Sequence, residues 1–301
     1  MTPIHIVEVG PRDGLQNEKA IVPTEIKLTL IEKLVQAGLK TIEATSFVSP
    51  KWIPQMADHA EIATKLSHSG VHFPVLVPNL KGFENALASG VKEIAVFAAA
   101  SETFSKKNIN RSIDESLREY KIICEKAKLA NIRVRGYVSC TLGCPYEGQV
   151  PLNQVVNVAH ALYQAGCYEI SLGDTIGVGT ALKAKEMVKA VSMNIPVSSL
   201  AVHFHDTYGQ ALANIFACFD LGIQTVDSSV AGLGGCPYAK GATGNVATEE
   251  VVYMCEGLGY PTGIDLDKLI EAGDFICHYL KQPNRSKVAI AMNAKKKLGV
   301  K

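Results

Sequence analysis

Apolar and polar positions follow two alternating patterns from near the first residue to about residue 260. Short runs rich in apolar and β-branched residues predict strands, and longer stretches with apolar residues at helical spacing predict helices between them. The predicted strands are "IHIVEV" from Ile4, "KTIEATS" from Lys40, "HFPVLV" from His72, "KEIAVFAA" from Lys92, "IRVRGYVSC" from Ile132, "YEISLG" from Tyr168, "LAVHFH" from Leu200 and "QTVDSSV" from Gln224. The clearest predicted helices cover residues 25–37, 113–130, 154–165 and 181–191.

This alternation predicts an α/β protein. Eight β-α units in sequence are what a (β/α)8 TIM barrel requires, and the remaining residues predict additional C-terminal helices. A doubly wound open sheet is the alternative, but no glycine-rich GxGxxG turn follows the first strand, so dinucleotide binding has no support. We therefore expect a single TIM-barrel catalytic domain over residues 1–301, with a C-terminal helical extension from about residue 265.

The predicted barrel has an unusually polar interior. In "LAVHFH", Val202 and Phe204 alternate with His203 and His205. Barrel strands pack their apolar outer face on helices, so both histidines are expected inside. The same reasoning places further polar residues inside, namely Glu43, Arg135, Asp227 and Ser229. Because unpaired buried charge is costly, these groups must pair with one another, with a metal or with a substrate.

Several candidate functional residues follow the ends of predicted strands, where TIM barrels place their active sites. They are Arg12 and Asp13 after the first strand, Asp174 after the sixth, His203 and His205 on the seventh, and Cys236 and Asn245 in the loop "AGLGGCPYAKGATGN" after the eighth. The strand ends of a barrel lie at one rim, so we expect these side chains to converge.

Four of these residues form a candidate metal site. His203 and His205 are two residues apart on a strand, so both imidazoles point to the same side and can reach one ion. Asp13 would add a carboxylate and Asn245 an amide oxygen. This mixed set suits Mg²⁺ or Mn²⁺, with Zn²⁺ or Co²⁺ as further options, and it is too rich in oxygen for a closed structural zinc site. The alternative for the two histidines alone is a hydrogen-bonded interior pair.

The other candidates each have a structural alternative. Arg12 is either a salt-bridge partner or a fixed cation that stabilises an enolate or carboxylate oxygen. Glu43 is either the buried partner of Arg12 or a proton-transfer group. Asp174 is either a helix N-cap or an active-site carboxylate. Cys236 is either an ordinary small loop residue or a thiol placed for acid–base work.

Composition excludes several classes of protein. The chain has 301 residues, and 30 basic against 29 acidic residues leave a net charge of +1, which indicates neither a nucleic-acid nor a membrane partner. The basic cluster at residues 295–297 is interpreted as a solvated tail, with an anionic ligand as the alternative. Eight cysteines without a CxxC pair indicate reduced thiols. With no signal peptide and no membrane span expected, we predict a cytoplasmic protein.

Five segments together resemble the 3-hydroxy-3-methylglutaryl-CoA lyase family of the DRE-TIM metallolyase superfamily. They are "VGPRDGLQNE", "TSFVSPKWIPQMAD", "SLGDTIGVGT", "HFHDTYGQALAN" and "AGLGGCPYAKGATGNVATE". The first has Arg12-Asp13-Gly14 where the superfamily usually has Asp-Arg-Glu, and the last, which includes Cys236, is the most specific. The resemblance covers residues from about 4 to about 290.

The resemblance implies a retro-Claisen cleavage of 3-hydroxy-3-methylglutaryl-CoA to acetyl-CoA and acetoacetate, as in leucine degradation and ketone-body formation. It implies that the divalent cation is bound by Asp13, His203, His205 and Asn245. Arg12 would stabilise the enolate of acetyl-CoA, and proton transfer would involve Cys236 and Asp174, with His203 and Glu43 as further contributors. It also implies an acyl-CoA substrate and a homo-oligomer, dimer or larger. The missing presequence indicates a bacterial-type enzyme.

Three other functions are weighed against this one. A Claisen condensing enzyme of the same superfamily, such as a 2-isopropylmalate, homocitrate or citramalate synthase, shares the two histidines and the arginine, but the Cys236 loop favours the lyase. An aldolase acting on a 4-hydroxy-2-oxoacid uses a similar site. A catalytically inactive thioester- or metal-binding barrel is disfavoured because Asp13, His203, His205, Asn245 and Cys236 are all present.

We expect Cys236→Ser to retain divalent-ion binding while lyase activity collapses, since the thiol is assigned to proton transfer and not to the metal. Metal titration and turnover of the same preparation check this. Near-normal turnover of the variant would mean that the thiol is structural.

Overall fold

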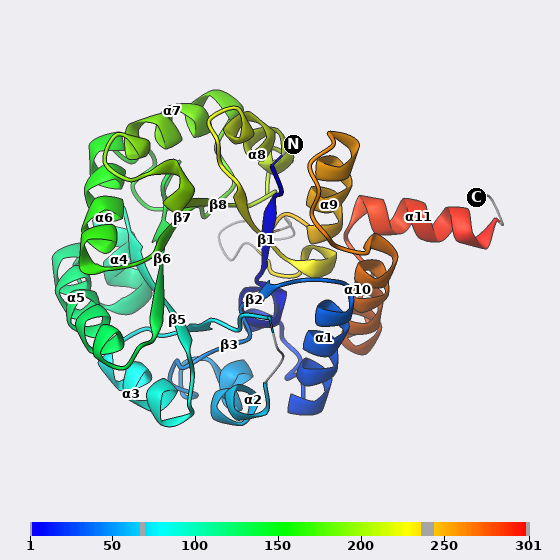
Figure 1. Ribbon diagram of the computed structural model, residues 1–301, viewed down its shortest axis with the longest axis horizontal. Coiled ribbons are helices and arrows are strands. Elements are labelled where there is room, and N and C mark those ends of the chain that lie inside the picture. The colour runs from blue at the N-terminus through cyan, green and yellow to red at the C-terminus, as the bar shows by residue number, and fades with distance from the viewer. Residues whose placement is uncertain (1, 67–69, 236–243, 299–301) are drawn as a thin grey trace.

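The strands of the chain form one closed parallel barrel (Figure 1). The computed structural model describes residues 2–66, 70–235 and 244–298. The strands are β1 (His5–Glu8), β2 (Thr41–Ile42), β3 (Thr45–Ser46), β4 (Val75–Leu76), β5 (Glu93–Ala99), β6 (Arg133–Ser139), β7 (Glu169–Asp174), β8 (Leu200–Phe204) and β9 (Thr225–Ser228). Their order is β2-β1-β9-β8-β7-β6-β5-β4-β3.

The ring closes because β2 and β3 are the two halves of a single barrel strand. β2 pairs with β1 and β3 pairs with β4. Between them the Glu43 amide donates to the Glu8 carbonyl, and the Ala44 amide donates to the Pro74 carbonyl. The nine short segments therefore make an eight-stranded barrel, which confirms the predicted (β/α)8 fold.

Helices surround the barrel and cover its outer face (Figure 1). The α-helices are α1 (Thr24–Gln36), α2 (His59–Lys65), α3 (Leu80–Ala88), α4 (Glu102–Ile109), α5 (Ile113–Leu129), α6 (Leu152–Ala165), α7 (Ala181–Ser192), α8 (Ala211–Phe219), α9 (Thr248–Gly257), α10 (Leu266–Leu280) and α11 (Lys287–Lys297). The short helical turns are η1 (Gly10–Gly14), η2 (Pro54–Met56), η3 (Val197–Ser199) and η4 (Val230–Gly232).

Local sequence signals explain where the predicted helices begin and end. Helix α5 starts with a capping box, in which the Ser112 hydroxyl accepts the Glu115 amide and the Glu115 carboxylate accepts the Ser112 amide. Helix α6 ends at Gly166, which adopts the left-handed conformation that glycine tolerates best. Such caps are encoded by a few neighbouring residues. All four predicted helices are observed to within two residues at each end.

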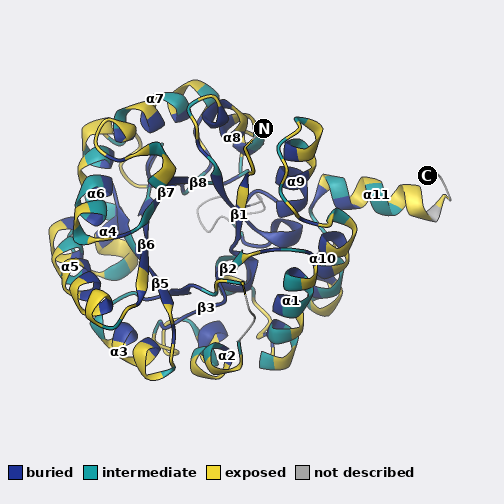
Figure 2. Cartoon of the chain, in the orientation of Figure 1, coloured by how far each residue is buried: buried dark blue, intermediate teal, exposed yellow. Residues whose placement is uncertain are grey.

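The main apolar core lies between the strands and the surrounding helices. Figure 2 shows the strands buried and the solvent-facing sides of the helices exposed. Val202 of β8 pairs in register with Val226 of β9, and His203 pairs with Asp227. Paired residues of parallel strands point to the same side of the sheet, so the valines share the outer face and the polar pair shares the interior. The predicted alternation is confirmed for these strands.

A charged network occupies the barrel interior. The Arg135 guanidinium donates to both carboxylate oxygens of Asp227, at 2.7 and 3.1 Å, and through Nε to Glu169 at 2.6 Å. Ser171 and Tyr137 complete this group, since the Ser171 hydroxyl donates to Asp227 and Arg135 donates to the Tyr137 oxygen. Two of the predicted interior charges, Arg135 and Asp227, are therefore paired with each other across the barrel.

The C-terminal helices extend the barrel on one side. Helix α10 packs against α1, and α11 projects outward from the ring (Figure 1). The basic cluster of residues 295–297 forms the last turn of α11, where Lys296 pairs with Asp267 of α10 at 2.9 Å. In the described part of the chain, none of the helices has the length and apolar character needed to cross a bilayer.

We expect Arg135→Met to lower the free energy of unfolding by about 3–5 kcal/mol, because it leaves the Asp227 carboxylate buried without its main partner. The urea midpoint followed by circular dichroism measures this. The matched control is Lys185→Met, which breaks the exposed Lys185–Asp220 pair and should cost about 1 kcal/mol or less. Equal midpoints for the two variants would contradict the assigned importance of the interior pair.

Candidate functional site

The turn η1 brings Arg12 and Asp13 to the C-terminal mouth of the barrel. The amides of Arg12, Asp13 and Gly14 all approach the Val9 carbonyl, at 3.2, 2.7 and 3.2 Å. The chain thus makes a single π-type turn directly after β1, a conformation often found at functional sites. This turn places the charged side chains of Arg12 and Asp13 in the mouth, within five residues of the end of β1 at Glu8.

The end of β8 and the chain after the glycine-rich loop form another part of the mouth, two strands from β1 in the sheet order. His203 is in β8 and His205 follows directly. Residues 244–246 run antiparallel beside this strand end, because the Asp206 amide donates to Gly244 and the Val246 amide donates to Phe204. His205 and Asn245 are bridge partners in this pairing. A residue 40 positions later in the sequence therefore lies beside the second histidine.

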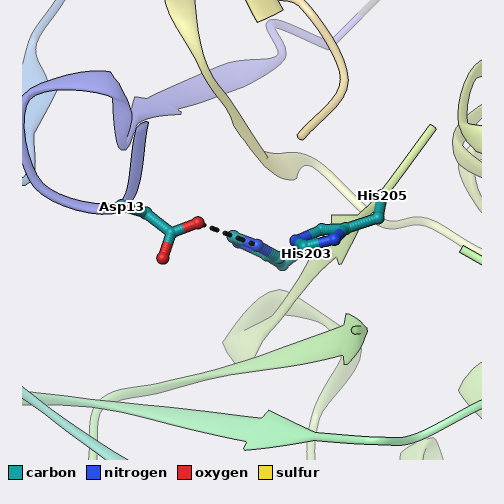
Figure 3. A group of neighbouring side chains, drawn as sticks. All are labelled: Asp13, His203 and His205. Atoms are coloured by element: carbon teal, nitrogen blue, oxygen red, sulfur yellow. Dashed lines mark ion pairs between the residues drawn. The ribbon is translucent and has the colours of Figure 1, made fainter. Parts of the chain in front are cut away.

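Asp13, His203 and His205 form a group that could hold a metal ion. Their ligand atoms all lie within 4.8 Å of one another. Figure 3 shows Asp13 approaching from η1 and the two imidazoles from β8, with His203 Nε2 4.0 Å from Asp13 Oδ2. Three of the four predicted metal ligands are thus brought together through their ligand atoms. No other group of three or more such side chains is found in the residues that the structure describes.

The protonation states of Asp13 and His205 suit a cation. Burial would raise the pKa of Asp13, but Arg12 and the two histidines lower it to about 2, so the carboxylate is charged at neutral pH. Burial lowers the pKa of His205 to about 4, so its imidazole is neutral and has a lone pair to donate. His205 Nδ1 is buried and has no hydrogen-bond partner among the described residues. An anionic oxygen and an unpartnered imidazole nitrogen are donors that fit a divalent ion.

Arg12 links Asp13 to Glu43. Its Nε donates to Glu43 and its Nη1 to Asp13, both at 2.6 Å. The guanidinium also lies 5.9 Å from the centre of the Tyr137 ring. Burial raises the pKa of Glu43 even though Arg12 opposes the shift. The alternative reading of Glu43 as the buried partner of Arg12 is confirmed, and its second oxygen, Oε1, has no partner within the described chain.

Asn245 lies in the site and touches Asp13. Its amide nitrogen donates to Asp13 Oδ2 at 2.8 Å and to the Leu233 carbonyl at 3.3 Å. A Cβ on Gly234 would come within 2.8 Å of this nitrogen, so the absence of a side chain at residue 234 is what allows Asn245 to sit there. The amide nitrogen faces the carboxylate in this arrangement, and ligation by the amide oxygen stays a prediction.

Asp174 lies at the end of β7 but turns toward the next loop. Its carboxylate accepts the Val178 amide at 3.2 Å and the Gly179 amide at 2.7 Å. The N-cap of α7 is Thr180, so the alternative that Asp174 caps this helix is wrong. Burial raises the pKa of Asp174. Cys236, the remaining predicted site residue, lies outside the described residues.

Sequence reasoning did not single out two buried carboxylates that hold the base of the glycine-rich loop. Glu8 Oε1 accepts the amides of Gly10 and Val230, at 2.7 and 2.8 Å, and Oε2 accepts the Thr248 hydroxyl at 2.6 Å. Glu249 accepts the next amide, that of Ala231, whose φ of 56° is unusual for a residue other than glycine. Glu8 thus ties η1 to η4. Its position on the outer face of β1, where apolar residues are expected, was the available signal.

Comparison with known proteins gives consistent matches. The model of the HMGL-like family matches residues 3–276. The mitochondrial hydroxymethylglutaryl-CoA lyase of Rattus norvegicus is 61% identical over 289 residues, which are 96% of this chain and 89% of that protein. The cytoplasmic 3-hydroxy-3-methylglutaryl-CoA lyase of the same organism is 60% identical, over 96% of this chain and 84% of its own. The crystal structure of hydroxymethylglutaryl-CoA lyase from Pseudomonas aeruginosa matches with a TM-score of 0.95 and 57% identity, covering 98% of each chain.

We expect Glu8→Gln to be more stable than the wild type at pH 8, and to have a smaller advantage or none at pH 5. Burial raises the pKa of Glu8 from 4.5 to about 7. The folded state therefore holds this proton more tightly, so the contribution is fully present below pH 4.5 and is lost as the pH rises through 7. Between these limits the wild-type Glu8 side chain should change the free energy of unfolding by about 3 kcal/mol. A glutamine can accept the two amides and donate to Thr248 without titrating.

Thermal unfolding of both proteins between pH 5 and pH 8.5 measures this difference. The wild type should lose more stability than Glu8→Gln over the upper part of the range. Parallel curves for the two proteins would show that Glu8 is charged throughout.

Proposed function

The chain belongs to the HMGL-like family, and on that basis we propose that it is a divalent-metal-dependent lyase that cleaves 3-hydroxy-3-methylglutaryl-CoA to acetyl-CoA and acetoacetate. The observation that carries the proposal is the convergence of Asp13, His203 and His205 beside Arg12 at the C-terminal mouth of the barrel. That mouth is where TIM-barrel enzymes carry their active sites. The identity of 61% to a hydroxymethylglutaryl-CoA lyase supports the same reaction.

The proposed metal ligands are Asp13, His203 and His205, with Asn245 as a fourth. One carboxylate, two imidazoles and one amide suit Mg²⁺ or Mn²⁺, with Zn²⁺ or Co²⁺ as further options. A bound divalent ion supplies Lewis-acid polarisation of the substrate oxygens, which lowers the pKa of the 3-hydroxyl. The neutral His205 and the anionic Asp13 are in the protonation states that ligation requires.

Arg12 is proposed to stabilise the enolate that departs as acetyl-CoA. When the C2–C3 bond breaks, its electron pair passes to the thioester enolate, and a fixed cation stabilises the negative charge that develops on that oxygen. Glu43 holds the Arg12 guanidinium from one side and Asp13 from the other, both at 2.6 Å. Because these contacts exist before substrate binds, the cation needs little reorganisation during the reaction.

Proton transfer is proposed for four residues. The cleavage needs a base for the 3-hydroxyl and an acid for the enolate carbon. Asp174 has its pKa raised by burial, which favours proton exchange nearer neutral pH. Cys236 is proposed for the same chemistry, and Glu43 and His203 are further contributors. Glu43 Oε1 has no hydrogen-bond partner among the described residues, which supports a contact with substrate.

The substrate class, cellular location and assembly of the enzyme are also proposed. An acyl-CoA substrate follows from the proposed reaction. One relative is cytoplasmic and another is mitochondrial, so a cytoplasmic location is our proposal for this chain. The bacterial type stays a prediction, because the relatives come from an animal as well as from a bacterium. A homo-oligomer and a single catalytic domain also stay predictions.

We expect purified protein to form acetoacetate from 3-hydroxy-3-methylglutaryl-CoA with Mg²⁺ or Mn²⁺, to lose this activity in EDTA and to regain it when the ion is restored. A coupled assay for acetoacetate measures it. The competing condensation is tested in parallel with 2-oxoisovalerate and acetyl-CoA. Turnover of that pair, with no cleavage under any metal, would replace the lyase with a condensing enzyme.

A further inference from the structure

His203 contacts a buried carboxylate on the side of its ring away from Asp13. Asp227 of β9 lies inside the barrel, and its Oδ2 is 3.2 Å from His203 Nδ1. The other ring nitrogen, Nε2, is the one that faces Asp13. The imidazole therefore lies between two carboxylates, one at the mouth and one in the interior. Among the described residues, no hydrogen bond or ion pair joins Asp227 to Asp13 or His205.

From this geometry we propose that Asp227 is a positioning residue, which keeps the proton of His203 on Nδ1 and leaves the Nε2 lone pair free for a divalent cation. The inference rests on the metal site of the proposed function. It assigns a role in metal binding to a residue that would not itself touch the ion. Because both ring nitrogens of His203 are then engaged, it leaves proton transfer to Asp174, Cys236 and Glu43.

The surroundings of Asp227 restrict it to accepting hydrogen bonds. Arg135 donates to both of its oxygens, and the Ser171 hydroxyl donates to Oδ2 at 2.7 Å. An arginine has no acceptor and stays protonated in proteins, so the carboxylate beside it remains an anion. An anionic carboxylate can only accept, which requires His203 Nδ1 to be the donor. The charge of Arg135 thus determines the tautomer of His203 through two successive hydrogen bonds, from Arg135 to Asp227 and from His203 to Asp227.

The same contacts hold the ring in place. Two bonds from Arg135 prevent rotation of the Asp227 carboxylate, and the edge of the Tyr137 ring lies against His203 with centroids 6.0 Å apart. His205 differs, because its Nδ1 has no such partner in the described chain. A carboxylate behind a ligating histidine orients the ring and raises its basicity, and its loss typically reduces metal affinity about 10- to 100-fold.

A purely structural role is the competing explanation. Asp227 is the main partner of Arg135, so it would be needed for stability even if His203 bound nothing. The two roles are separable because an asparagine at residue 227 cannot accept from every donor around it. Its neutral amide oxygen accepts from Nδ1 more weakly than a carboxylate does. The His203 proton is then no longer held on Nδ1 and can move to Nε2, where it blocks that nitrogen.

The test is a titration of the metal-free protein with Mn²⁺, followed by electron paramagnetic resonance, which measures affinity without substrate or turnover. We expect Asp227→Asn to bind Mn²⁺ about 10- to 100-fold more weakly than the wild type. The matched control is Glu93→Gln, which alters a buried carboxylate bonded to Tyr168 and Arg133 at the far end of the barrel. It should bind Mn²⁺ within twofold of the wild type.

A second variant covers the case in which Asp227→Asn does not fold. Asp227→Asn combined with Arg135→Gln removes both members of the buried pair, so no unpaired arginine remains. We expect this double variant to fold and still bind Mn²⁺ weakly. In addition, ¹⁵N spectra of the metal-free wild type should show His203 protonated at Nδ1, and those of the double variant should show the proton shifted toward Nε2.

The outcomes separate the inference from the proposed function. If the wild type itself fails to bind Mn²⁺, the metal site is wrong and the inference falls with it. If the wild type binds Mn²⁺ and both Asp227 variants bind it equally well, the metal site stands and the positioning role of Asp227 is overturned. Weaker binding by the double variant with an unchanged His203 tautomer would also overturn it.

Discussion

The ion pair between Arg135 and Asp227 crosses the barrel interior, and the rest of the site is arranged around it. Charge buried in a medium of low dielectric is tolerated only where an opposite charge and hydrogen bonds compensate for the lost water. Arg135 meets this condition with Asp227 on one side and Glu169 on the other. Asp227 in turn contacts His203, which faces the mouth. The polar interior is thus a continuous chain of contacts from the centre of the barrel to the candidate metal centre.

A second chain of charges lies at the mouth itself. Arg12 is held between Glu43 and Asp13, so its charge is neutralised on two sides while its position is fixed. The same guanidinium lowers the pKa of Asp13 and so favours the anion that a cation requires. Beneath these groups, Glu8 connects the turn after β1 to the turn after β9. Two loops that share the site therefore have a common anchor outside the barrel.

Much of this arrangement follows from sequence patterns. The strands and the four clearest helices were predictable because strand alternation and helical spacing of apolar residues act over a few residues. The inward direction of Glu43, Arg135, Asp227 and His203 followed from the period of a strand. Pairings between distant residues did not follow, because periodicity tells which face a side chain is on and not which partner it meets. The contacts Arg135–Asp227 and Asp227–His203 span 92 and 24 residues.

The histidines illustrate the division between sequence and tertiary structure. The sequence by itself determined that His203 and His205 share one face of a strand, since alternation is a property of the extended backbone. It also placed Asp13, Asp174 and Asn245 after strand ends, because chain order and barrel topology require it. Only the tertiary structure decided that Asp13 reaches the histidines while Asp174 turns to the amides of the next loop. The reason is physical: each carboxylate takes the strongest donors within reach, and which donors are in reach depends on how separate segments of the chain pack together.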